Sequence, residues 1–125
     1  MPSTHHGILI HTVFSTKNRK PMIDVEWQDD LYAYMGVTAR EHKAIIVCSG
    51  GIEDHVHLLI KIHPAFAVSS TVQLIKANAS RWVNDERLTR WNFEWQRGCG
   101  AFSVSQSRAR RVKQYIHNQR EHHRK

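Results

Sequence analysis

One short segment, residues 54–62 with the sequence DHVHLLIKI, restricts the folds open to this chain more than any other. Every second position in it is aliphatic, whereas the positions between them carry His55, His57, Leu59 and a lysine. Side chains of a β-strand point alternately to its two faces, so one face of this strand is apolar and the other is largely polar. Such a strand belongs in a sheet that packs against helices on one side. The aliphatic positions are Val56, Leu58, Ile60 and Ile62.

Hydrophobic periodicity divides the rest of the chain into further strands and helices. Runs of β-branched and aromatic residues indicate strands, and apolar residues three and four positions apart indicate amphipathic helices. Asp24 is a suitable N-cap for the first helix, and Gly50 with Gly51 predicts a tight turn between two strands. In chain order the predicted elements are a strand at 8–16, a helix at 24–42, strands at 44–49 and 54–62, a helix at 67–86, a strand at 101–105 and a helix at 107–123.

This order of elements, β-α-β-β-α-β-α, predicts a ferredoxin-like α+β sandwich. We expect an antiparallel sheet with the helices on one face, which leaves the other face for a ligand, a partner or a second subunit. The chain has 125 residues and contains neither a repeat nor a linker, so we expect a single domain over 1–125.

Charge is the feature of the composition that bears most on partners. Lys and Arg number 18 against 11 Asp and Glu, and the formal net charge of +7 favours a polyanionic partner, nucleic acid first. A merely basic soluble protein stays open as the alternative. No membrane span and no signal peptide are indicated, so we expect a cytoplasmic protein without a membrane partner. Cys48 and Cys99 are expected to be free thiols.

Basic residues gather at 15–20, 108–113 and 120–125, and others lie on the polar side of the second predicted helix. They are candidate phosphate contacts, although each could equally be a solvated surface charge. The alternating aromatic residues of the segment 91–95 could stack bases, but packing in the core or in a dimer is the favoured interpretation. The candidate DNA-binding residues are Lys17, Arg19, Lys20, Lys76, Arg81, Arg108 and Arg111.

Two histidines at positions i and i+2 of a strand lie side by side, which is a recurrent way to hold a divalent metal. His55 and His57 would need further ligands, and these are oxygens if the metal is Mg²⁺ or Mn²⁺. Tyr115 and Gln119 lie four residues apart on the last helix and so share a face. Gln119 could supply a third ligand, with Tyr115 beside the metal. The alternatives are a histidine pair that binds water and a partly buried tyrosine beside a solvated glutamine.

Four segments, in this order and at these intervals, resemble the single-tyrosine transposases of the insertion-sequence 200/605 group, also called IS200-like or HUH transposases. They cover nearly the whole chain and read GGIEDHVHLLIKI, SSTVQLIKANASRWVN, FEWQRGCGAFSVS and VKQYIHNQREHH. The resemblance implies that His55, His57 and Gln119 bind a divalent metal, Mg²⁺ or Mn²⁺, and that Tyr115 is the nucleophile. Cys99 departs from the family pattern, which has an aromatic residue at that position.

The resemblance implies a DNA transposase that cleaves and rejoins single-stranded DNA at insertion-sequence ends through a 5′-phosphotyrosine intermediate. Its implied partners are single-stranded DNA or DNA hairpins at element ends, and a second copy of the chain. In that homodimer the tyrosine helix of one subunit would meet the histidines of the other. Two cleavages per excision also require two tyrosines, hence two subunits.

Two alternatives remain open at this point. One is a non-catalytic or domesticated nucleic-acid-binding module derived from such a transposase. The other is a replication initiator or conjugative relaxase, which uses the same histidine-and-tyrosine chemistry. We rank initiators and relaxases lower because their chains are usually larger and their motifs follow a different order.

Overall fold

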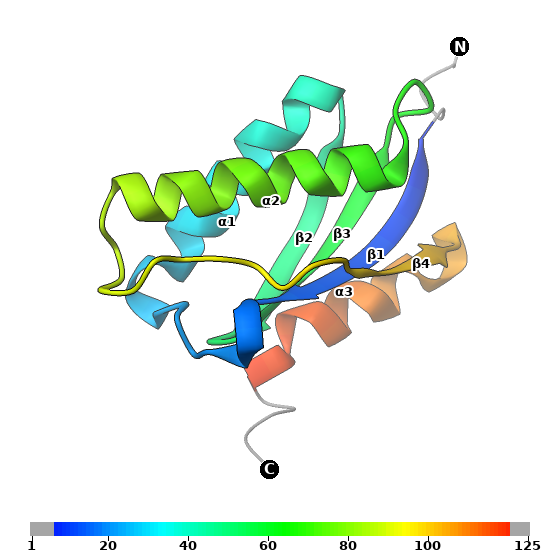
Figure 1. Ribbon diagram of the computed structural model, residues 1–125. Helices are drawn as coiled ribbons and strands as arrows, with labels where there is room; N and C mark the ends of the chain where they lie inside the picture. The colour runs from blue at the N-terminus through cyan, green and yellow to red at the C-terminus, as the bar shows by residue number, and fades with distance from the viewer. Residues whose placement is uncertain (1–6, 121–125) are drawn as a thin grey trace.

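The computed structural model describes residues 7–120, and its strands and helices follow one another in the predicted order (Figure 1). Residues 121–125, which include most of the predicted basic patch at 120–125 and the end of the last predicted helix, lie outside the described residues. The elements are β1 (Ile8–Ser15), η2 (Lys17–Arg19), α1 (Val25–Ala39), η3 (Arg40–His42), β2 (Ile45–Ile52), β3 (His55–Ile62), α2 (Val68–Asp85), β4 (Gly100–Val104), η4 (Gln106–Arg108) and α3 (Ala109–His117).

The four strands form one antiparallel sheet in the order β2-β3-β1-β4. β1 is a central strand, in which Val13 lies opposite His57 of β3 and His11 lies opposite Phe102 of β4. The crossovers run through α1 and α2, and the hairpin of β2 and β3 lies between them. This is the ferredoxin-like arrangement, so the predicted fold class is confirmed.

The sheet lies between two helical layers of unequal size (Figure 1). On one side α1 and α2 bury the aliphatic positions of β3 in the main hydrophobic core. On the other side α3 packs against β2 and β3 over a small apolar cluster formed by Cys48, Leu59 and Ile116. The prediction that the helices lie on one face therefore holds for α1 and α2 but not for α3. The apolar stripe of α3 packs on the face that we expected to be open.

Gly50 and Gly51, which were predicted to form a turn, lie inside β2 instead, and the turn to β3 follows at residues 53–54. A Cβ atom on Gly50 would collide with the carbonyl oxygen of Ile116 in α3. A Cβ atom on Gly51 would collide with the carbonyl oxygen of His55. Gly50 therefore allows the backbone of α3 to approach the sheet more closely than any side chain would permit.

The segment between α2 and β4 is tied to α2 by Lys76. This lysine is buried, and its ammonium donates hydrogen bonds to the carbonyl oxygens of Gln96 at 2.9 Å and Gly98 at 2.8 Å. Burial lowers the pKa of Lys76 from its ordinary value. The ammonium is thus used inside the fold, and this position does not suit the phosphate contact predicted for Lys76.

The aromatic residues of the same segment divide between the core and the surface. Phe93 is buried, and Trp95 packs edge-on against Phe93 and against Phe14, with ring centroids 4.8 Å apart in both pairs. Trp91 remains 46% exposed. The favoured interpretation, packing rather than base stacking, is therefore confirmed for Phe93 and Trp95.

Two expectations drawn from the composition can be compared with the structure directly. Cys48 and Cys99 are both free thiols, the first buried and the second exposed. In the part of the chain that the structure describes, no helix combines the length and the apolar character needed to cross a membrane.

Candidate active site

The predicted site residues converge on the face of the sheet that α3 covers. β3 supplies His55 and His57, while α3 and the residues that follow it supply Tyr115 and Gln119. The two histidines are only 6% and 5% exposed, because α3 lies over them. A cavity of about 330 Å³ opens at this place, lined by Val13, Phe14, Ser15, Arg19, His55, His57 and Tyr115.

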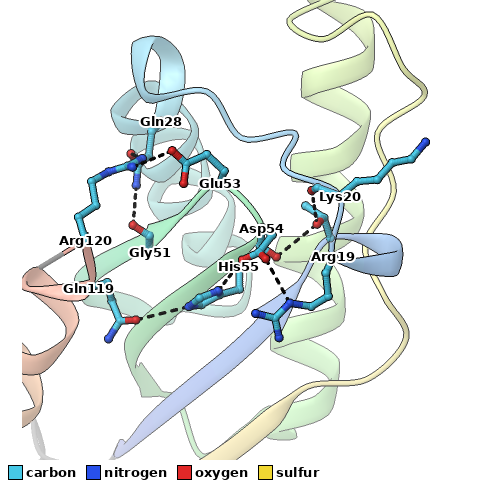
Figure 2. A network of polar contacts seen from close by, with 10 residues as sticks. Arg19, Lys20, Gln28, Gly51, Glu53, Asp54, His55, Gln119 and Arg120 are labelled. Carbon is cyan, nitrogen blue, oxygen red and sulfur yellow. Dashed lines mark hydrogen bonds and ion pairs between the residues drawn. The ribbon is translucent and has the colours of Figure 1, made fainter. Parts of the chain in front are cut away.

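A row of polar contacts holds His55 from both sides (Figure 2). Its Nδ1 lies 2.8 Å from Oδ1 of Asp54, and its Nε2 lies 3.4 Å from Oε1 of Gln119. The amide nitrogen of Gln119 donates to the carbonyl oxygen of Tyr115 at 3.2 Å, which turns the amide oxygen toward His55. An ionised carboxylate can only accept hydrogen bonds, so the proton of this contact is on Nδ1 of His55.

This proton assignment makes the contact between His55 and Gln119 informative. In the neutral imidazole with a proton on Nδ1, Nε2 carries a lone pair. Nε2 and the amide oxygen of Gln119, 3.4 Å apart, are then both electron-pair donors, and a cation placed between them could bind to both. The donor set of two imidazoles and one amide oxygen suits a borderline or hard divalent ion, so the residues fit the metal that the resemblance in sequence implies.

Other residues do not offer an alternative metal site in the described part of the chain. Within residues 7–120 no three or more His, Cys, Asp and Glu side chains are grouped so that they could hold a metal ion. A metal site at His55 and His57 therefore depends on Gln119 and on groups from substrate or solvent.

His57 is held by a third histidine. Its Nδ1 lies 2.9 Å from Nε2 of His11 in β1, and the two rings stack with centroids 5.2 Å apart. The rings of His55 and His57 meet at an angle of 67° with centroids 5.1 Å apart. Burial lowers the pKa of His11, which favours its neutral form. Three imidazoles thus lie in series on one face of the sheet.

Tyr115 is the tyrosine that faces the histidines. Its ring meets those of His57 and His11 edge-on, at centroid distances of 5.6 and 6.1 Å, and its side chain is 44% exposed. The other two tyrosines lie on α1, on the opposite side of the sheet. Burial raises the pKa of Tyr32 to about 12, partly offset by its hydrogen bond from Gln28, and Tyr34 stacks on Trp82. Tyr115 therefore has the accessibility that a nucleophile requires.

Arg19 is the predicted DNA-binding residue that reaches this cavity. Its Nε donates to Oδ2 of Asp54 at 3.3 Å, while its side chain remains 63% exposed. Arg19 and the preceding Asn18 both have positive φ angles, 55° and 58°, a conformation that is uncommon away from glycine. Burial opposes ionisation of Asp54, but hydrogen bonds from His55 and Arg19 outweigh it and lower the pKa of this carboxyl.

A second network, beside the first, fixes the chain directly after Gln119 (Figure 2). The guanidinium of Arg120 donates to Oε2 of Glu53 in the β2–β3 turn and to Oε1 of Gln28 in α1, both at 2.9 Å. Gln28 in turn donates to the carbonyl oxygen of Gly51 at 3.2 Å. The position of Gln119 is thereby tied to α1 and to the turn that carries Asp54.

The remaining predicted DNA-binding residues lie away from the histidines or at the edge of the site. Lys17 forms an ion pair with Glu94 at 3.6 Å, and Lys20 lies over the ring of Trp91. Arg81 is on α2, on the far side of the sheet, where it donates to Asn78. Arg108 and Arg111 are exposed at the start of α3.

Sequence reasoning missed three residues that orient the site: His11, Asp54 and Arg120. His11 could have been found from the alternation of β1, which places it on the face opposite to Ile10 and Phe14. Asp54 was visible as the residue before His55, but a turn residue has no fixed direction in a sequence pattern. Arg120 has no local signal, because both of its partners are far away in the chain.

Comparison with known proteins agrees with this geometry. The family model described as "Transposase IS200 like" matches residues 4–119. The chain belongs to the IS200-like transposase family. No match was found among curated proteins.

Two solved structures share the fold of this IS200-like transposase chain. One is a candidate transposase from Deinococcus radiodurans R1, with a TM-score of 0.73, 21% sequence identity and 95% of each chain covered. The other is a REP-associated tyrosine transposase bound to a REP hairpin, with a TM-score of 0.67 and 16% identity, covering 89% of this chain and 65% of the other. At these sequence identities the two matches show a shared fold and nothing more.

Proposed function

We propose that this IS200-like transposase cleaves and rejoins single-stranded DNA through a covalent bond to Tyr115, with Mg²⁺ or Mn²⁺ bound by His55, His57 and Gln119. The observation that carries the proposal is the placement of an exposed tyrosine beside two buried histidines and an arginine in one cavity. We take 1–125 as one domain that acts in the cytoplasm.

The reaction that this geometry supports is a transfer in which no bond energy is lost to hydrolysis. The phenolic oxygen of Tyr115 gives up its proton to solvent and attacks phosphorus, and the bond from phosphorus to the 3′ oxygen breaks. The 3′ oxygen takes up a proton, so the products are a 5′-phosphotyrosine and a free 3′-OH. Attack by another 3′-OH reverses the step and joins the new strands.

The chain's own residues bind and orient the phosphate in this reaction. The exposed edge of the Arg19 guanidinium is available for phosphate oxygens, since Asp54 engages only its Nε. A divalent ion on His55, His57 and Gln119 would neutralise the charge that develops on the phosphate. Lys17, Lys20, Arg108 and Arg111 are proposed to contact the flanking strand, whereas Arg81 lies on the other side of the sheet.

The test is a covalent protein–DNA adduct. Single-stranded oligonucleotides that tile both strands of the DNA flanking the gene are incubated with the protein and Mn²⁺ and then run on a denaturing gel. One of them should give an adduct that requires the metal and is absent with His57→Ala. An oligonucleotide that is retained on a native gel, with no adduct from any, would instead identify a non-catalytic binding module.

The nucleic-acid part of the proposal has its own readout. In a plot of the logarithm of the association constant against the logarithm of the salt concentration, affinity for a single strand should fall with a slope of roughly 0.7 per phosphate contacted. Hairpin oligonucleotides belong in the same series, because a structural neighbour was solved with a REP hairpin. An affinity that does not change with ionic strength would exclude phosphate recognition by the basic residues.

We also propose a homodimer, because excision needs two cleavages and only Tyr115 faces the histidines. Within one chain Tyr115 lies beside His57 and Gln119 beside His55, so an exchange of α3 between subunits stays a prediction. Mixing His57→Ala with Tyr115→Phe tests it, since rescue of single-end cleavage requires sites shared between chains. A protein that sediments as a monomer with DNA bound would contradict the dimer itself.

A further inference from the structure

We propose that His11 is a positioning residue: it accepts a hydrogen bond from Nδ1–H of His57 and so keeps the Nε2 lone pair of His57 directed at the ligand site. The inference rests on the proposed function only for what binds at Nε2. The state of the imidazole pair itself is a property of the protein alone.

The sheet register brings these two rings together. Val13 lies opposite His57, so His11 is its diagonal neighbour on the same face, one alternate position further along β1. β1 is paired on both sides, with β3 and with β4, and this leaves the His11 backbone little freedom. The His11 ring also packs against the rings of Phe102 and Tyr115, with ring centroids 6.2 and 6.1 Å away.

The 2.9 Å contact between Nε2 of His11 and Nδ1 of His57 admits one proton, which belongs to one ring or the other. If His11 donates, the remaining proton of neutral His57 must be on Nε2, and that nitrogen cannot bind a metal. If His57 donates, its Nε2 carries the lone pair, and the second nitrogen of His11 carries a proton. His11 is only partly buried, so solvent can accept from that second nitrogen.

The neighbouring histidine supports the second assignment. Asp54 accepts from Nδ1 of His55 and leaves Nε2 of that ring toward Gln119. With His11 as acceptor, His55 and His57 both present Nε2 to the ligand site. The Nδ1 atom of each ring is held by a residue that is not a proposed ligand, Asp54 for His55 and His11 for His57. Such outer partners typically change metal affinity by about 10–100-fold when they are removed.

The first experiment needs no metal and reads the wild-type protein, with variants used only for assignment. Long-range ¹⁵N–¹H correlation spectra of the metal-free protein report which nitrogen of each histidine is protonated, and His57→Ala and His11→Gln assign the signals. We expect His57 to carry its proton on Nδ1. A wild-type His57 protonated on Nε2 overturns the proposal, whatever the protein does with DNA.

The second experiment measures Mn²⁺ binding to the DNA-free protein by electron paramagnetic resonance titration. His11→Phe keeps a ring but removes the acceptor, and should weaken binding about 10–100-fold. His11→Gln places an amide oxygen near the position of Nε2 and should recover most of that loss. Equal affinities of wild type and His11→Phe overturn the proposal.

The two measurements also separate this inference from the proposed function. Wild-type protein that binds no Mn²⁺, or a His57→Ala variant that binds it normally, contradicts the proposed metal site. The spectra then still decide the direction of the bond between His11 and His57. Thermal unfolding of His11→Phe in EDTA checks that the variant retains its fold.

Discussion

The two faces of the sheet differ in how they are packed, although the same strand, β3, contributes side chains to both. The face toward α1 and α2 is a continuous apolar core in which Val56, Leu58 and Ile60 are completely buried. The face toward α3 has a small apolar cluster and, beside it, a series of imidazoles with an amide and a carboxylate. The first face supplies most of the apolar burial that stabilises the domain. On the second face a small apolar cluster holds α3 over the polar groups.

This difference has a consequence for how α3 is held in place. A helix that buries little apolar surface depends on close backbone approach and on specific polar contacts. Gly50 provides the first at Ile116, and Arg120 provides the second at the end of the helix. The residues that place Tyr115 and Gln119 are therefore separable from those that stabilise the domain.

The largest expected effect removes the chemistry without touching either core. Tyr115→Phe should abolish the DNA adduct, because it deletes the nucleophilic oxygen and keeps the exposed ring. The free energy of unfolding should change by less than about 0.5 kcal/mol, as for most surface substitutions. Tyr34→Phe, on the other side of the sheet, is the matched control and should keep full activity. An adduct that persists in Tyr115→Phe would assign the nucleophile elsewhere.

Adjacent leucines of β3 allow the two faces to be compared within one strand. Leu58 and Leu59 are both 0% exposed, but Leu58 belongs to the main core and Leu59 to the cluster under α3. Leu58→Ala should cost close to the upper end of ~2–5 kcal/mol, and Leu59→Ala close to the lower end, because α3 can move to fill the space.

Urea denaturation with the adduct assay distinguishes the two leucine variants further. Leu59→Ala should lose more activity than its stability loss explains, whereas Leu58→Ala should retain activity wherever it is folded. If Leu58→Ala were the more damaging to activity at equal folded fraction, the assignment of separate roles to the two faces would be wrong.

The sequence was sufficient for the main core because alternation and helical spacing act through local rules. The faces of β3, the cap at Asp24 and the order of elements followed from those rules. The second face was harder, since α3 packs there through a contact without a side-chain signature. A pair of glycines in a sequence usually indicates a turn. Only the structure shows that Gly50 is needed because the backbone of Ile116 lies against it.

The site shows the same limit. His55, His57, Tyr115 and Gln119 were found from spacing and resemblance, and the structure places them together, while their roles stay predictions. His11 was missed because its partner lies on another strand, 46 residues away in the chain. The burial of Lys76 was missed for a similar reason, because a lysine on the polar side of a helix can be covered by a segment that is distant in the chain.

Gly50 of β2 provides the third test. Gly50→Ala should shift α3 away from the sheet, and a misplacement of about 1 Å can lower a reaction rate on the order of 10²-fold. Gly36→Ala in α1 is the control, because a Cβ there meets nothing within 4 Å and should add about 0.5–1 kcal/mol of stability. The adduct assay and thermal unfolding measure both. Normal activity in Gly50→Ala would show that the close approach is unnecessary.

The smallest expected effect concerns the clamp at the end of α3. The hydrogen bond from Arg120 is the main cause of the lowered pKa of Glu53. A carboxyl with a lowered folded-state pKa contributes stability above its unfolded value, near 4.3 for glutamate, and loses it as the pH falls through the folded value. Both side chains are about one-third to one-half exposed, so Arg120→Met should cost only about 0.5–1 kcal/mol at pH 7.

The pH dependence identifies the cause of that small loss. The difference in unfolding free energy between wild type and Arg120→Met should shrink between pH 5 and about pH 3, as Glu53 becomes protonated in the folded protein as well. Arg111→Met, which removes an exposed arginine at the start of α3, corrects for the change in net charge. Urea denaturation at several pH values gives the comparison. A difference that stays constant to pH 3 would mean that Arg120 acts through Gln28 alone, and the turn that carries Asp54 would then be held independently of α3.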